Sequence, residues 1–163
     1  MKLASLIDLI FPGRCLHCSA HVDGDAVLCH PCIGTITRRT ALLCGQCHAR
    51  LADGKKVCHK NFPYLLGTVS DYHNDAVRNL IHGLKFKFIR KAGAVGGQFL
   101  VGYMKALPVN WKLFSVIPVP LATARQRQRG FNQSLLIAEV VAKRFELPLL
   151  SDNLVRQRSP PPQ

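Results

Sequence analysis

Acidic residues are scarce in this sequence, and their scarcity makes the chain strongly basic. Its 163 residues include 9 Asp and Glu against 22 Lys and Arg, which gives a formal net charge of +13 and an isoelectric point near 9.9. A charge of this size suits negatively charged partners. Nucleic acid, phosphate-bearing ligands and acidic surfaces all meet that description, and composition does not choose among them.

Long hydrophobic runs are also missing. No stretch approaches the roughly 20 consecutive apolar residues that cross a bilayer. Residues 1–11 carry one lysine and a short apolar run interrupted by Asp8, and no small-residue cleavage site precedes Pro12, so a secretion signal is not indicated. Apolar residues recur there at helical spacing: Leu3, Leu6, Ile7 and Ile10. We therefore expect residues 1–13 to form an amphipathic helix that packs on the protein's own core, and no membrane span.

The seven cysteines are an odd number, and their spacing does not favour disulfides. They fall into two sets, in which two residues separate the partners of a pair and ten residues separate a pair from the next cysteine: Cys15, Cys18, Cys29 and Cys32, then Cys44, Cys47 and the single Cys58. Cysteines three positions apart bridge poorly to each other. A four-residue turn with sulfur at each end can instead direct both thiolates at one tetrahedral metal ion, so the spacing predicts zinc. Free thiolates belong in a reducing compartment, and we expect the protein in the cytoplasm.

The two sets of cysteines differ in completeness. The first four make a closed, structural four-thiolate site with no position open for catalysis. In the second set Asn61 stands where a fourth cysteine would fall, and an amide is a poor zinc ligand. His59 and His48 are the nearest replacements, and His59 is the one we favour; as an alternative, both are exposed loop histidines. We therefore predict one zinc site, with a second that depends on His59. Spacing alone leaves a cross-braced pairing between the sets open.

The rest of the chain alternates between strand and helix patterns. Residues 14–60 have few large apolar residues, so metal would supply much of their folding free energy. The predicted elements that follow are strand 66–72, a helix from 75 to 84, helix 93–106, strand 113–119 covered on both faces, helix 132–145 and short strands at 149–150 and 154–155. Asn74 or Asp75 would cap the first helix and Asn132 the last. This alternation predicts an α/β fold with a parallel sheet.

Two basic segments stand out in this half. Lys85, Lys87, Arg90 and Lys91 surround two phenylalanines. Arg125, Arg127 and Arg129 alternate with glutamines ahead of the last predicted helix. These three arginines either contact phosphates of DNA or of a nucleotide sugar, with help from the helix N-terminus, or form a solvated basic loop. No Ser-His-Asp or Cys-His catalytic arrangement is evident, and no catalytic residue is predicted.

Four segments together resemble the ComF/GntX family of bacterial phosphoribosyltransferase-like proteins. Besides the paired cysteines, which follow Ile-Phe-Pro-Gly-Arg, they are Leu-Ile-His-Gly-Leu-Lys-Phe at 80–86, Pro-Val-Pro-Leu at 118–121 and Arg-Gly-Phe-Asn-Gln-Ser at 129–134. The resemblance implies a double zinc ribbon over residues 14–63 and a type I phosphoribosyltransferase-like domain over 64–163. It also implies a role in using or processing imported DNA, as in natural competence, with single-stranded DNA or DNA-processing proteins as partners.

The sequence departs from the family pattern in two places. Asn61 replaces the family's eighth cysteine. The family also continues into a strand, paired acidic residues and a Thr-Thr-Gly loop that would hold phosphoribosyl pyrophosphate (PRPP), and this sequence contains none of them. We therefore expect a C-terminally incomplete transferase-like domain, no phosphoribosyl transfer, and binding of PRPP or nucleotide only in a longer form. The alternative function is a zinc-ribbon module that binds nucleic acid or protein without catalysis.

Overall fold

The computed structural model describes residues 12–51, 58–59 and 64–157. The predicted helix over 1–13 lies almost entirely outside these residues, as does Asn61. The elements in chain order are α2 (His30–Gly34), β1 (Leu43–Cys44), β2 (Leu65–Leu66), α3 (Asp75–Phe86), α4 (Arg90–Lys105), the 3₁₀-helix η1 (Trp111–Leu113), α5 (Thr123–Arg129) and α6 (Gln133–Phe145). Among the described residues, none of the helices is long and apolar enough to cross a membrane.

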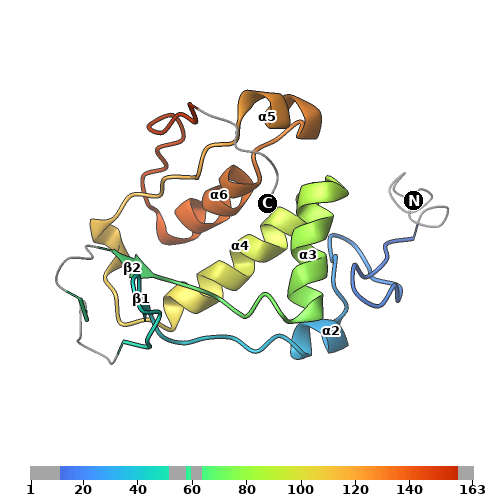
Figure 1. Cartoon of the computed structure of the whole chain (residues 1–163). Helices are drawn as coiled ribbons and strands as arrows, with labels where there is room; N and C mark the ends of the chain where they lie inside the picture. Colours follow the sequence, from blue (N-terminus) through green and yellow to red (C-terminus); the bar gives the residue numbers. More distant parts are fainter. Residues whose placement is uncertain (1–11, 52–57, 60–63, 158–163) are drawn as a thin grey trace.

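Three helices form the centre of the molecule, with α4 between α3 and α6 (Figure 1). The predicted caps are confirmed: the Asn74 side chain accepts a hydrogen bond from the Val77 amide at 3.1 Å, and Asn132 accepts one from the Ser134 amide at 3.0 Å. Helix α4 begins three residues earlier than predicted, at Arg90. These side-chain acceptors satisfy amides that would otherwise be unpaired at the start of α3 and α6.

Glycines on α4 allow α6 to approach closely. A Cβ atom placed on Gly93 would lie 2.9 Å from the Cβ of Leu136, and one placed on Gly97 would lie 2.6 Å from the Cβ of Val140. Real Cβ atoms do not approach this closely, so the two helices can pack at this distance only with hydrogen at those positions. Gly93 and Gly97 therefore serve the close packing of α4 against α6.

The cysteine-rich segments flank the helices. We call residues 12–36 the first cysteine unit, and residues 41–51 with 58–59 the second cysteine unit; they lie beside α3 and near β1 and β2 respectively (Figure 1). The first unit shares a buried core with the helices, in which Leu28 packs in one cluster with Leu80 and Ala92. The second unit is joined to the far end of α4, where the buried Tyr103 hydroxyl donates to the Ala41 carbonyl at 2.7 Å.

The predicted parallel sheet is not present as a sheet in the described residues. Residue 116 forms one isolated parallel bridge to Leu149: the Val116 amide donates to the Pro148 carbonyl at 2.8 Å, and the Leu150 amide donates to the Val116 carbonyl at 2.9 Å. The predicted strand 66–72 is reduced to β2, which pairs antiparallel with β1 of the second cysteine unit. The regular sheet that the structure describes is therefore small and belongs to the cysteine-rich part.

Segment 113–119 also differs from its prediction in burial. The side chain of Leu113 is 80% exposed and that of Val119 is 65% exposed, so the run is not covered on both faces. The first residue of the segment, Leu113, belongs to the 3₁₀-helix η1 and not to a strand. Pro118 has no backbone N–H, so it cannot donate a further hydrogen bond to a neighbouring strand. Residues 114–119 still border an apolar cavity of about 430 Å³ between α4 and α6. The predicted strand at 154–155 is likewise irregular and exposed.

Candidate metal centres

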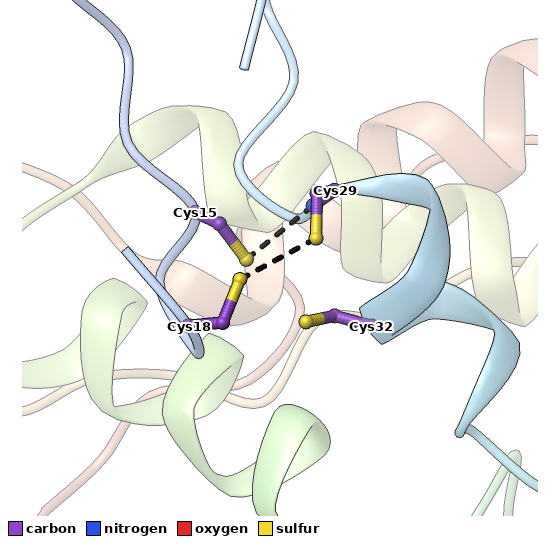
Figure 2. A group of neighbouring side chains, drawn as sticks. All are labelled: Cys15, Cys18, Cys29 and Cys32. Carbon is purple, nitrogen blue, oxygen red and sulfur yellow. Dashed lines mark hydrogen bonds between the residues drawn. The ribbon is translucent and has the colours of Figure 1, made fainter. Parts of the chain in front are cut away.

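The first cysteine pair sits in a tight turn. The Ser19 amide donates to the Cys15 carbonyl at 3.0 Å, and the Cys15 amide donates to the Ala20 carbonyl at 2.8 Å. Ser19 completes the turn with a φ of 63°, a left-handed conformation that is uncommon outside glycine. This backbone path brings the Cys15 and Cys18 thiols to the same side of the turn, as Figure 2 shows.

The pair in the second cysteine unit repeats this turn. The His48 amide donates to the Cys44 carbonyl at 2.9 Å, the Cys44 amide donates to the Ala49 carbonyl at 2.9 Å, and His48 has a φ of 58°. The residue after each pair thus adopts the left-handed conformation. Because His48 occupies this backbone position, its role is to close the turn, and the group of possible metal ligands that the structure describes does not include it.

Helix α2 positions the remaining ligands of the first unit. Cys29 is its N-cap residue and Cys32 lies in its first turn, with a proline between them that favours the start of a helix. The Cys29 amide donates to the Cys15 sulfur at 3.4 Å, and the Cys18 and Cys29 sulfurs are 3.5 Å apart. Figure 2 shows all four thiols directed toward a common centre.

The second group has three thiols and an imidazole. The Cys47 and Cys58 sulfurs are 3.4 Å apart, and the Nδ1 atom of His59 lies 3.4 Å from the Cys44 sulfur and 2.9 Å from the Cys58 sulfur. In each group the four ligand atoms all lie within 4.8 Å of one another. Zinc with ligands at about 2.3 Å places tetrahedral sulfur atoms about 3.8 Å apart, so both groups fit this ion.

The two groups differ in exposure. In the first, Cys15 and Cys32 are buried against the helical core, with exposed fractions of 2% and 6%. In the second, Cys44 is buried, but Cys47, Cys58 and His59 are all exposed. Solvent therefore reaches most ligand residues of the second group, but only some of the four cysteines of the first group.

Backbone amides stabilise one thiolate in each group. Burial raises the pKa of Cys15, but hydrogen bonds from three backbone amides, that of Cys18 foremost, outweigh this effect and lower the pKa to about 6. The amides of Cys47 and Gln46 act in the same way on Cys44 and lower its pKa to about 5. Each group thus contains one thiol that is deprotonated at neutral pH, which is the form that binds metal.

Other thiols in the groups hold their protons more tightly. The Cys29 thiol, and burial after it, raises the pKa of Cys32. The thiols of Cys44 and Cys47 raise the pKa of Cys58 to about 12. Several thiolates at such short distances repel one another, so a cation is needed at the centre before all of them can ionise.

The three arginines predicted as phosphate contacts lie on a helix. A solvated loop was one of the two interpretations of this segment, but α5 covers Thr123–Arg129 and ends at Gly130, whose φ is 74°. Arg125 and Arg129 are one turn apart and share a half-buried face, whereas Arg127 is exposed and faces elsewhere. Burial and the neighbouring charge of Arg125 lower the pKa of Arg129. The structure therefore brings two of the three arginines together.

Comparison with known proteins agrees with this geometry. Residues 6–61 match the model of the double zinc ribbon domain. The chain is 26% identical over 144 residues to the competence protein ComFC of Bacillus subtilis (strain 168), a match that covers 82% of this chain. Both matches agree with the resemblance of the sequence to the ComF family. The match covers 59% of ComFC, so the chain spans about three fifths of the length of this relative. No solved structure matches the chain.

Sequence reasoning missed two features of this protein. It did not identify the backbone amides, such as that of Gln46, that donate to the first sulfur of each pair. It also missed the contact of Arg90, whose guanidinium lies 5.0 Å from the centre of the Phe131 ring and joins the start of α4 to the segment before α6. The repeated Cys-x-x-Cys turns carried a signal for the amides, since residues inside such a turn face the first sulfur. The sequence held no comparable signal for the Arg90 contact.

Proposed function

We propose that this protein handles imported DNA during natural competence, as a ComF-like protein of the cytoplasm. The observation that carries the proposal is the similarity to a protein named for competence over 144 residues, beside the double zinc ribbon match over residues 6–61. The formal charge of +13 supports it, because DNA is a dense polyanion. Single-stranded DNA and DNA-processing proteins are the proposed partners. A reducing cytoplasm would keep the thiols free to bind metal.

Each ligand group holds one zinc ion in this proposal. The first site uses Cys15, Cys18, Cys29 and Cys32, and the second uses Cys44, Cys47, Cys58 and His59. Two sites replace the single one that the sequence favoured, because His59 supplies the nitrogen that Asn61 cannot. Both ions are structural, since four protein ligands leave no open position for substrate. Residues 14–63 would then be a metal-stabilised unit beside a transferase-like domain over 64–163.

Phosphoribosyl transfer is not the activity that we propose for these 163 residues. The sequence contains no Thr-Thr-Gly loop behind paired acidic residues, and PRPP needs such donors and carboxylates. The parallel bridge between Val116 and Leu149 is what supports a transferase-like arrangement here. Arg125 and Arg129 would contact phosphates from one face of α5. Arg127 would make no direct contact and would add only to the positive electrostatic potential around them.

The second candidate function is a zinc-ribbon module that binds nucleic acid or protein and catalyses nothing. The two complete ligand groups favour it, since structural zinc sites commonly shape binding surfaces. Calorimetric titration of the zinc-loaded protein with PRPP, beside retention on immobilised single-stranded DNA, separates the two functions. DNA binding together with saturable PRPP binding supports the transferase-like protein, and it would also show that PRPP binding does not require the Thr-Thr-Gly loop. DNA binding alone supports the module, and binding of neither ligand contradicts the role in handling DNA.

A further inference from the structure

The corner between α3 and α4 exposes two aromatic rings among basic side chains. Residues 85–88 read Lys-Phe-Lys-Phe, and all four are exposed. Phe86 is 63% exposed and Phe88 is 42% exposed, which is high for phenylalanine in a folded protein. Neither ring is needed for the core that α3 builds from Ala76, Leu80 and Leu84 on its opposite face.

The backbone holds Phe88 in a conformation that is costly for a bulky residue. Its φ is 55°, in the left-handed region that side chains with a Cβ atom rarely occupy. The amide of Ile89 donates to the Gly83 carbonyl at 3.0 Å, and the amide of Lys87 donates to the His82 carbonyl at 3.4 Å. Strain of this kind is often found at functional sites, where the surrounding structure enforces it.

Further rings extend the aromatic surface along α3. The ring centres of His82 and Phe86 are 5.2 Å apart in an edge-to-face arrangement. The hydroxyl of Tyr72, which is 50% exposed, lies 3.2 Å from Nε2 of His82. Tyr72, His82 and Phe86 therefore form an exposed row, and Phe88 follows it at the end of the helix.

Positive charge surrounds these rings. No carboxylate among the described residues lies within ion-pair distance of Lys85 or Lys87. Arg90 follows directly and lies over the Phe131 ring, which places it beside the segment that begins at Arg129. In Figure 1 the end of α3 and the first turn of α4 lie toward α5, so the two basic segments approach each other.

We propose that the α3–α4 corner is a binding surface for single-stranded nucleic acid. Bases stack on the rings of Phe86 and Phe88, while Lys85, Lys87 and Arg90 neutralise the phosphates. Exposed ring faces require unstacked bases, which a duplex does not offer, so the surface selects single strands. The inference rests on the proposed function and adds to it the residues that contact DNA and the way in which they do so.

The first experiment measures binding of the zinc-loaded full chain to a fluorescent oligo(dT) of about 15 nucleotides by anisotropy. We expect Phe86→Ala and Phe88→Ala each to weaken binding about five-fold or more. Phe114→Ala is the matched control, because Phe114 is 52% exposed but lies before the Val116 bridge, away from this corner. Phe86→Trp should retain binding, whereas Phe86→Leu should lose it, since leucine keeps apolar area and has no ring face.

The second experiment tests the charges. Replacing Lys85 and Lys87 by alanine should reduce the slope of log affinity against log salt by about 0.7 for each lysine. Lys105 and Lys112 provide the control pair, and Lys105 matches Lys85 as a basic residue in the last turn of its helix. Their double alanine variant should leave the slope unchanged.

The outcomes distinguish failure of the proposed binding surface from failure of the proposed role in handling DNA. If the wild-type chain fails to bind the oligonucleotide, the proposed role in DNA handling is wrong. If it binds and the Phe86 and Phe88 variants bind equally well, only the stacking surface is wrong. If those variants lose binding to vesicles of anionic phospholipid but not to oligo(dT), the corner faces a membrane and the proposal is overturned. Circular dichroism of each variant confirms that it is folded.

Discussion

Gly97 lies so close to Val140 that a methyl group at position 97 would fall 2.6 Å from the Val140 Cβ. This relationship fixes the distance between α4 and α6, the pair of helices that supports both the apolar cavity and the segment before α5. Gly102 in the same helix differs from Gly97, since nothing lies within 4 Å of a Cβ placed on Gly102. Position 97 therefore requires glycine, whereas position 102 has room for a side chain.

We expect Gly97→Ala to lower the free energy of unfolding by about 1–3 kcal/mol, because the helices must separate to admit the methyl group. The control is Gly102→Ala in the exposed part of α4, which should raise stability by about 0.5–1 kcal/mol through helix propensity alone. Urea unfolding followed by circular dichroism measures both changes. Equal effects of the two substitutions would contradict the packing described for α4 and α6.

Replacement of His59 should remove one zinc ion. In our proposal His59→Ala lowers the zinc content from about two ions per chain to about one, since three thiols without a fourth ligand hold zinc weakly. His48→Gly should leave the content unchanged, because that residue closes the turn and glycine tolerates its φ of 58°. Elemental analysis of the purified variants gives the stoichiometry. Loss of zinc from His48→Gly with retention in His59→Ala would reverse the assignment.

Zinc affinity should fall as the pH falls. Neighbouring thiols raise the pKa of Cys58 to about 12 and that of Cys32 above its usual range, so each site must release at least one proton when it binds zinc near neutral pH. The apparent affinity of each site should then drop about ten-fold per pH unit for each proton released. Competition with a chromophoric chelator between pH 6 and pH 8 tests this dependence. Affinity that does not change over this range would mean that the thiols are already ionised without metal.

The conformation of Phe88 can be tested by stability alone. At a φ of 55° glycine is unstrained, whereas alanine has a Cβ atom that this conformation disfavours. We therefore expect Phe88→Gly to be more stable than Phe88→Ala by about 1 kcal/mol, the reverse of the order at ordinary positions. Thermal unfolding of the two variants supplies the comparison. If the alanine variant is the more stable, as at ordinary positions, Phe88 does not have the left-handed backbone conformation.

The features that sequence predicted well depend on neighbours along the chain. Asn74 and Asn132 cap helices through amides only two or three residues away, and the Cys-x-x-Cys turns close on themselves.

The errors concern pairing between distant segments. Val116 and Leu149 do come together in parallel, yet a single bridge does not make the predicted sheet, and strand pairing depends on neighbours that apolar patterns do not specify. Helix α5 was missed for a different reason. Its alternating arginines and glutamines show no apolar face, although both residues favour helices and Gly130 provides a left-handed end.

Helix α4 has a consequence for the geometry of the whole protein. Its beginning packs with the first cysteine unit through Ala92, and its end holds the second through the hydroxyl of Tyr103. A helix of 16 residues is a rod about 24 Å long. The helix therefore fixes the distance between the two cysteine units. A molecule that contacts both units at once must span this fixed distance, because no flexible linker can adjust it.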